Sequence, residues 1–192
     1  MTTETLNPDI LAGQDATLAR LTADKSGVLG RIGTLETRIA RTASEIDAAQ
    51  AIRYRVFVEE MHAQVPPESA RKRRDIDAWD AICDHLLVLD TAIEGDAEDQ
   101  IVGTYRLLRQ DVAMANGGFY SSSEFEVADL VARHPDKRFM ELGRSCVLPQ
   151  YRTKRTVELL WQGNWAYALK HRIDVMFGCA SFSGAVPEEH AL

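Results

Sequence analysis

The sequence predicts an α/β fold in which helices flank a mixed β-sheet. Two β-rich segments, HLLVLDTA (85–92) and IVGTYRLLRQ (101–110), are separated by an acidic, glycine-containing turn and indicate an antiparallel hairpin. Further along, the segments 139–148 and 174–182 have strand character and flank a helical pattern over 155–172. Because a strand–helix–strand unit sets its two strands in parallel, the sheet should contain both strand orientations.

A strand and a helix are expected to begin the ordered part of the chain. In LETRIAR (35–41), apolar or hydroxyl side chains alternate with charged or small ones, as in a half-buried strand. Thr42 and Glu45 then form a capping-box signature, and apolar residues recur at helical spacing as far as residue 61. The strand should therefore lead directly into a helix.

Length and composition indicate one domain. The 192 residues include 45% hydrophobic ones, and the mean hydropathy is -0.22. Residues 1–34 lack a sustained apolar pattern, so we expect a mobile leader there and the domain over 35–192. The segment PEE (187–189) suits the first turn of a helix, yet the sequence ends at Leu192, and we expect a fold truncated at its C-terminus.

Charge and composition argue against several classes of protein. The net charge of -7 would repel a polyanion, so nucleic acid is not an expected partner. No apolar run reaches the roughly 18 residues that span a bilayer, and the N-terminus lacks the regions of a signal peptide, which predicts a cytoplasmic protein. The five histidines and the cysteines lack metal-ligand spacing, so we expect no metal. We interpret Cys83, Cys146 and Cys179 as small buried residues.

Two further features concern loops and aromatic side chains. The segment 62–84 contains two prolines and a basic run at 71–74, and we expect an exposed loop. Trp79 is interpreted as a core or lid residue. The helix 155–172 has one apolar face, expected to pack against the core and composed of Val157, Leu160, Trp161, Trp165 and Leu169.

A basic turn joins the strand 139–148 to the helix that follows it. A helix N-terminus presents unpaired N–H groups and partial positive charge, so cations there create a site suited to a phosphate. The alternative is a basic turn surrounded only by solvent. The residues concerned are Arg152, Thr153, Lys154, Arg155 and Thr156.

The motif VLPQYR (147–152), followed by a helix and an apolar strand, resembles the acyl-donor site of the GNAT N-acyltransferases. In that fold a glycine-rich loop after the motif holds the pyrophosphate of coenzyme A. Thr153, Arg155 and Val157 stand at the three glycine positions here. Together with the cations, this departure implies a donor with one phosphodiester, the acyl-phosphopantetheine of acyl carrier protein, and no separate cofactor.

A longer set of motifs narrows the resemblance. RYRVF (53–57), DIDAWD (75–80), GTYRLL (103–108) and ELGRSCV (141–147) follow the order and approximate spacing shared by acyl-homoserine-lactone synthases and their relatives. Together with GGFYSSSEF and YRTKRTVELLWQG, they resemble the hemolysin-like L-ornithine N-alpha-acyltransferases of ornithine-lipid synthesis over residues 35–192. The marked positions of the family pattern are occupied here by Arg53, Phe57, Asp77, Asp80, Arg106, Glu141 and Arg144.

This resemblance implies the first step of ornithine-lipid synthesis: transfer of a 3-hydroxyacyl group from acyl carrier protein to the α-amine of L-ornithine, by a cytoplasmic protein in peripheral contact with the inner membrane. Arg53 and Phe57 would border the acceptor cleft, although Arg53 also suits a salt bridge on the helix surface. Asp77 and Asp80 would neutralise the acceptor's side-chain ammonium or cap a short helix. The basic run at 71–74 would steer the acidic carrier protein or remain solvated.

Glu141 and Arg144 lie three residues apart on one strand, so their side chains point to opposite faces unless a bulge intervenes. By the resemblance, Glu141 receives the ammonium or relays its proton, and the alternative is a structural ion pair. Arg144 and Arg106 would hold the ornithine carboxylate, or an arginine would instead fix Asp77 or Asp80 across the loop.

The oxyanion donor of GNAT folds is a strand N–H near the splayed parallel pair, which corresponds here to the segment from Cys146 through Val147 to Leu148. No base accompanies Cys146 in the sequence, so we do not expect it to act as a nucleophile. Two alternative functions stay open: an acyl-homoserine-lactone-type synthase that uses S-adenosylmethionine, and a non-catalytic remnant that binds acyl carrier protein or lipid.

Overall fold

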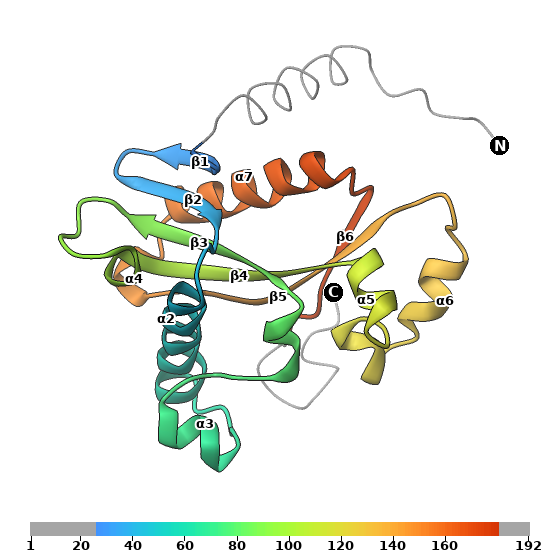
Figure 1. Cartoon of the computed structure of the whole chain (residues 1–192), viewed down its shortest axis with the longest axis horizontal. Coiled ribbons are helices and arrows are strands. Elements are labelled where there is room, and N and C mark those ends of the chain that lie inside the picture. Colours follow the sequence, from blue (N-terminus) through green and yellow to red (C-terminus); the bar gives the residue numbers. More distant parts are fainter. Residues whose placement is uncertain (1–25, 181–192) are drawn as a thin grey trace, which may run out of the picture.

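The computed structural model describes residues 26–180 and contains one six-stranded sheet in the order β1-β2-β3-β4-β5-β6 (Figure 1). Neighbouring strands are antiparallel except for β5 and β6, which are parallel. The predicted mixed sheet, its hairpin and its strand–helix–strand unit are thus confirmed. The strands are β1 (Val28–Ile32), β2 (Leu35–Ile39), β3 (Asp84–Asp90), β4 (Ile101–Arg109), β5 (Phe139–Val147) and β6 (Val175–Phe177).

Two long helices cover opposite faces of this sheet (Figure 1). Helix α2 (Ala43–Arg53) continues as the π-helical segment η1 (Tyr54–Glu60) on one face, and α7 (Lys154–His171) lies on the other. The shorter elements are α3 (Pro67–Lys72), η2 (Ala78–Ala81), α4 (Ala97–Gln100), α5 (Gln110–Ala115), η3 (Tyr120–Ser123), α6 (Val127–Ala132) and η4 (Pro149–Tyr151).

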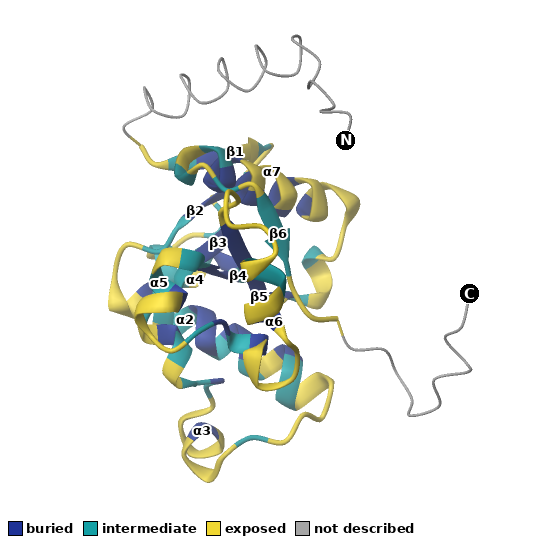
Figure 2. Ribbon diagram, turned by 90° about the vertical axis from the view of Figure 1, so that its right-hand side faces the viewer, coloured by how far each residue is buried: buried dark blue, intermediate teal, exposed yellow. Residues whose placement is uncertain are grey.

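Strand β3 lies at the centre of the core and is buried on both faces (Figure 2). Leu86 and Val88 pack in the cluster beneath α7, whereas Leu87 and Leu89 pack in the cluster beneath α2. Because side chains alternate across a strand, a continuous apolar run supplies both layers at once.

A third apolar cluster lies where β4 and β5 meet the small helices. Phe119 of the loop before η3 packs with Leu108 of β4 and Phe139 of β5. The ring of Phe119 also lies edge-on to Phe177, with 4.9 Å between ring centroids. This packing holds the η3 loop against the middle of the sheet, where the candidate site lies.

The N-cap predicted at Thr42 is present at the start of α2, but Glu45 does not complete the capping box. Thr42 accepts a hydrogen bond from Glu45 N at 3.2 Å, as expected of an N-cap. The Glu45 carboxylate binds Arg38 at 2.6 Å and Arg41 N at 2.6 Å instead of closing a box on Thr42. The hydrogen bond from Arg38 lowers the pKa of Glu45, so the helix start is fastened to β2 by a buried ion pair.

Several boundaries differ from the sequence prediction. Strand β1 lies inside the expected leader of residues 1–34, because Val28–Ile32 can pair with β2 across a tight turn. The expected loop 62–84 contains α3 and η2. Strand β6 has three half-buried residues, Val175–Phe177, instead of a fully buried run over 174–182, and residues 181 and 182 lie outside the described part of the chain. Cys179 is exposed, and only Cys146 of the three cysteines is buried.

The apolar face predicted for α7 was wrong in part. Trp161 and Trp165 are about half exposed, at 52% and 47%, whereas Gly163 and Tyr167 face the sheet. A Cβ atom at Gly163 would lie 2.8 Å from Thr37 Cγ2, so the helix approaches β2 too closely for a larger residue. Trp79, by contrast, packs against the third cluster as predicted. Among residues 26–180, no helix combines the length and the apolarity that crossing a bilayer requires.

We expect Gly163→Val to destabilise the protein by about 2 kcal/mol, because its side chain must displace Thr37 in a packed interface. Glu158→Val adds a similar side chain at an exposed position of the same helix and is the matched control. Urea unfolding monitored by circular dichroism measures both free energies. Equal stabilities for the two variants would contradict the close packing of α7 on β2.

Candidate functional site

Strand β5 contributes to the walls of two cavities. The smaller one, about 30 Å³, is lined by Cys83, Arg106, Leu108, Tyr120, Glu141, Gly143 and Arg144. The larger one, about 530 Å³, is lined mainly by η1 and its C-cap (Val56, Phe57, Glu60, Met61), by the end of β5 (Ser145, Cys146, Val147) and by α7 with the turn before it (Arg152, Val157, Leu160, Trp161), together with Tyr105. Successive residues of one strand thus contribute to two sites.

A β-bulge at Arg144 explains how the strand serves both cavities. Thr104 pairs with Cys146 and Arg106 pairs with Gly143, so two residues of β5 stand opposite one residue of β4. Arg144 has a left-handed backbone with a φ of 51°. The bulge shifts the alternation of side chains, and Glu141 and Arg144 therefore line the same cavity despite their spacing of three.

The Glu141 carboxylate is buried and held by the η3 loop. It accepts hydrogen bonds from Tyr120 N at 2.7 Å, from Ser121 N at 3.0 Å and from the Ser121 hydroxyl at 2.7 Å. Within the described residues it has no ion-pair partner, so the alternative of a structural ion pair does not hold there. A carboxylate offers about four lone-pair positions, which leaves one for a further partner.

Behind the small cavity lies a buried network of arginines and aspartates. Arg53 contacts Asp75 at 2.9 Å and Asp80 at 2.8 Å, and Arg106 contacts Asp77 at 2.6 Å and Asp80 at 3.1 Å. The network joins α2, the segment around η2 and β4. Arg144 joins the network through Asp75 at 3.2 Å and Asp77 at 3.5 Å. Five residues predicted to bind substrate are therefore partners within one network: Arg53, Asp77, Asp80, Arg106 and Arg144.

The charge on Asp80 is strongly stabilised. Burial alone would raise the pKa of its carboxyl, but the hydrogen bond and charge of Arg53, together with the charge of Arg106, lower the pKa to about 2. Asp80 also accepts a hydrogen bond from Asp77 N, and Asp77 accepts one from Trp79 N at 2.9 Å, which closes a capping box at η2. The expected capping role of these aspartates is thus present.

The arginines differ in what they can reach. Arg53 is fully buried, pairs with Asp75 and Asp80, and lines neither of these cavities. Arg106 and Arg144 reach the small cavity, and their guanidinium carbons lie 5.3 and 5.4 Å from the centroid of the Tyr120 ring. The Arg144 side chain is 30% exposed, against 4% for Arg106, and is therefore the one accessible from outside.

The large cavity opens where the two parallel strands separate. Pairing between β5 and β6 ends at Glu141 and Phe177. The part of β5 beyond this point, from Gly143 to Val147, is paired on its other edge by β4. Phe57, which the resemblance implied for the acceptor cleft, lies on the wall of this large cavity.

The predicted basic turn borders the same cavity. Arg152 binds both carboxylate oxygens of Glu60, at 2.5 and 2.7 Å, and donates to Val147 O at 2.9 Å. Thr153 is the N-cap of α7 and accepts from Thr156 N at 3.3 Å, while Thr156 is buried. Lys154 and Arg155 are exposed in the first turn of α7. Of the five residues, only Arg152 lines the cavity itself.

The two cavity thiols are kept neutral by their surroundings. Burial raises the pKa of Cys83 and that of Cys146 to about 12. A thiol is a nucleophile only as its thiolate, so neither cysteine is suited to covalent catalysis near neutral pH. This agrees with the sequence interpretation of Cys146.

The sequence analysis missed several residues that build the site. Asp75 completes the network, and Tyr120 and Ser121 hold Glu141, but they lie in loops whose contacts no periodic pattern reports. The motif GGFYSSSEF was the one signal that pointed to the η3 loop. Met61 and Tyr105 also line the large cavity; Tyr105 lies within the motif GTYRLL, but only its neighbour Arg106 was singled out there.

Comparison with known proteins places these features in a family. A model described as an acetyltransferase (GNAT) domain matches residues 52–162, more than half of the chain. The chain belongs to the GNAT acetyltransferase family. The match includes β5, the basic turn and the first half of α7.

Curated relatives confirm the narrower resemblance that the motifs indicated. The chain is 79% identical over 170 residues to the L-ornithine N(alpha)-acyltransferase of Rhizobium meliloti. The aligned region covers 88% of this chain and 57% of that protein. It is 75% identical over 169 residues to the protein of the same name from Agrobacterium fabrum, covering 88% and 58%. The chain thus spans less than three fifths of the length of these relatives.

A solved structure supports the fold. FeeM, an N-acyl amino acid synthase from uncultured soil microbes, aligns with a TM-score of 0.52 at 17% identity and covers 74% of this chain and 68% of its own. At this identity the likeness concerns the arrangement of strands and helices. The GNAT-like mixed sheet is therefore confirmed.

The buried network predicts a specific dependence of stability on pH. The pKa of Asp80 is lowered to about 2, so its contribution of roughly 2 kcal/mol is present above the unfolded pKa near 4 and is lost as the pH falls towards 2. We expect Asp80→Asn to be less stable than the parent by about 3 kcal/mol at pH 7, because it leaves two buried arginines undercompensated.

The difference in the free energy of unfolding between the parent and Asp80→Asn should become smaller below pH 4. Urea unfolding at pH 7, 5, 3 and 2 measures it. Asp47→Asn is the control, because Asp47 forms an exposed pair with Arg74 and should cost little at any pH. A difference for Asp80→Asn that stays constant down to pH 2 would contradict the lowered pKa.

Proposed function

We propose that this chain forms the acyl-transfer site of an N-acyltransferase that moves a 3-hydroxyacyl group from acyl carrier protein to the α-amine of L-ornithine, the first step of ornithine-lipid synthesis. The observation that carries the proposal is that successive residues of β5 line a large, largely apolar cavity and a small one containing Glu141. The names of the relatives support the acceptor, L-ornithine.

The large cavity suits the acyl donor. Val56, Phe57, Leu160 and Trp161 offer an apolar surface for a fatty chain. The thioester carbonyl would lie against β5 near Cys146 and Val147, where a strand N–H can stabilise the negative charge that develops on its oxygen. This charge stabilisation is needed because attack of an amine on a thioester passes through a tetrahedral oxyanion.

Cations at the mouth of the cavity suit the phosphodiester of the donor. Lys154 and Arg155 lie in the first turn of α7, where unpaired backbone N–H groups add to their charge. Arg152 is held by Glu60, which fixes its position at the entrance. An acyl-phosphopantetheine would enter past these residues with its fatty chain leading.

The small cavity suits the reacting amine. Its volume of about 30 Å³ is close to the space that one water molecule occupies in the liquid, so it holds the amino group while the remainder of the acceptor stays on the open side. The ornithine carboxylate would then meet Arg144, the more exposed of the two cavity arginines. Glu141 would accept a proton from the ammonium, directly or through one water.

The reaction needs no covalent intermediate on the protein. The deprotonated amine attacks the thioester carbon, the C–N bond forms and the C–S bond breaks. The amine loses one proton to Glu141 on activation and a second on collapse of the tetrahedral intermediate, and the departing thiolate takes up one proton. Alignment of donor and acceptor at neighbouring positions along one strand lowers the barrier by removing much of the entropy cost of their encounter.

Direct assay tests the proposal. The 192-residue chain is incubated with 3-hydroxyacyl-acyl carrier protein and L-ornithine, and mass spectrometry follows the N-acylated product. We expect acylation of ornithine at its α-amine. Acylation of S-adenosylmethionine alone, in a parallel reaction without ornithine, would identify a lactone-type synthase, and binding of the carrier protein without any transfer would identify a non-catalytic domain.

Glu141→Gln should lower kcat by roughly a hundredfold or more, the usual contribution of a positioned general base. Glu158→Gln, at an exposed position of α7, should retain the parent rate. A cooperative thermal unfolding transition would establish that Glu141→Gln folds despite the altered bonds to Tyr120 and Ser121. A parent rate in a folded Glu141→Gln protein would reject this role.

The double variant Lys154→Gln, Arg155→Gln should raise the KM for acyl carrier protein about tenfold with little change in kcat, because the phosphate contact holds the donor before and during transfer alike. The parent KM should rise with ionic strength and the variant KM much less. The matched control is Arg71→Gln, Lys72→Gln, which removes the same charge from α3. An equal rise of KM in both would indicate general charge steering.

A further inference from the structure

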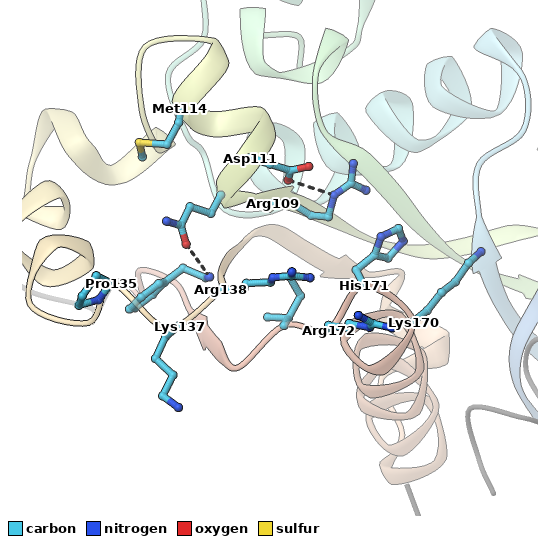
Figure 3. A pocket seen from close by; sticks show the side chains of 12 residues that line it. Arg109, Asp111, Met114, Pro135, Lys137, Arg138, Lys170, His171 and Arg172 are labelled. Atoms are coloured by element: carbon cyan, nitrogen blue, oxygen red, sulfur yellow. Dashed lines mark hydrogen bonds and ion pairs between the residues drawn. The ribbon is translucent and has the colours of Figure 1, made fainter. Parts of the chain in front are cut away.

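A second cationic cavity lies at the opposite end of α7 from the proposed donor site. Its volume is about 750 Å³, and the side chains around it converge from β4 and α5, from the segment before β5, and from the end of α7 (Figure 3). One acidic residue, Asp111, lines it. The basic residues are Arg109, Lys137, Arg138, Lys170, His171 and Arg172.

This concentration of positive charge is only partly compensated, because Arg109 pairs with Asp84 and Asp111 while other basic residues of the cavity have no such partner. The chain as a whole carries a net charge of -7. Within residues 26–180, the side chains of Arg138, Lys170 and Arg172 have no acidic partner, and Lys137 has only the neighbouring Asp136 at 3.4 Å. Cations that face one another without counter-charges repel, and a bound anion relieves that repulsion.

The helix dipole explains only part of the cluster. Lys170, His171 and Arg172 lie at the C-terminus of α7, where cations are favoured. Lys137 and Arg138 come from the segment before β5 and Arg109 from the end of β4, so the dipole does not account for their convergence on the same hollow.

The floor of the cavity is fixed by a hydrogen-bond network. Arg109 donates to Asp84 at 2.8 Å and to the hydroxyl of Tyr167 at 2.6 Å, and that hydroxyl donates to Asp84. The ring of His171 stacks on Tyr167 with 4.3 Å between centroids. A charged side chain held in place in this way loses little entropy when it binds a ligand.

We propose that this cavity binds a phosphate group and that this site is separate from the acyl-donor site. Arginine and lysine side chains converging from separate elements match the several oxygens of a phosphate. The 18 residues of α7 place its two ends about 27 Å apart, so one phosphate cannot occupy both regions. The volume exceeds that of a lone phosphate, which indicates a ligand with further groups, either a phospholipid headgroup or a soluble phosphorylated molecule.

Two measurements distinguish a soluble phosphorylated ligand from a phospholipid headgroup. Isothermal titration calorimetry with inorganic pyrophosphate tests a soluble ligand, and co-sedimentation with phosphatidylcholine vesicles, with and without phosphatidylglycerol, tests a lipid headgroup. The variant Arg138→Gln, Lys170→Gln should bind at least about tenfold more weakly, because it loses two charge-assisted contacts to the phosphate. Arg138→Lys, Lys170→Arg keeps the charges and should retain binding.

The matched control is Arg71→Gln, Lys72→Gln, which makes the same change of charge on α3. Saturable pyrophosphate binding that is lost only in the cavity variant supports a soluble ligand. Binding confined to phosphatidylglycerol vesicles, and lost in the same variant, supports a lipid headgroup. Binding to neither probe, or equal loss in cavity variant and control, would overturn the proposal. These readouts do not depend on acyl transfer, so they stand apart from the proposed function.

Discussion

The shared carboxylate of Asp80 is the contact on which the site depends. It receives Arg53 from α2 and Arg106 from β4, and it lies in a segment that has no strand or long helix to hold it. Removing three charged groups from water is costly, and only their close mutual contacts offset that cost. The same contacts fix the loop that carries Cys83 to the wall of the small cavity, so the shape of that cavity depends on paired charges as well as on the apolar packing of the third cluster.

A single extra residue in β5 then decides how the strand is used. Without the bulge opposite Tyr105, alternation would direct Glu141 and Arg144 to opposite faces. With it, both line the small cavity, and the next three residues turn to the large one. The left-handed backbone of Arg144 is an uncommon conformation for an arginine, and the contact between its guanidinium and Asp75 helps to hold it there.

The sequence predicted the strands of the sheet more reliably than the contacts within the candidate site. Apolar runs such as 85–92 report burial directly, because a strand covered on both faces needs such a run. Hydrophobicity did not reveal which face of α7 packs on the sheet. Gly163 lies on that face, where the helix and β2 approach closely, whereas Trp161 and Trp165 lie half exposed at the surface. The contacts of Tyr120 with Glu141 join residues 21 apart through a loop, and no local pattern carries that information.

The helix dipole of α7 favours basic side chains at one end of the helix and disfavours them at the other. Lysine and histidine in the last turn complement the negative end of the dipole, so part of that charge is explained by helix stability alone. Lys154 and Arg155 lie at the positive end, where the dipole disfavours cations and acidic residues would be expected. Glu158 offsets Lys154 only weakly, at 3.6 Å and largely in solvent. Charge placed against the dipole is more readily explained by an anion that binds there, whereas at the opposite end the argument for a ligand rests on the convergence of separate elements.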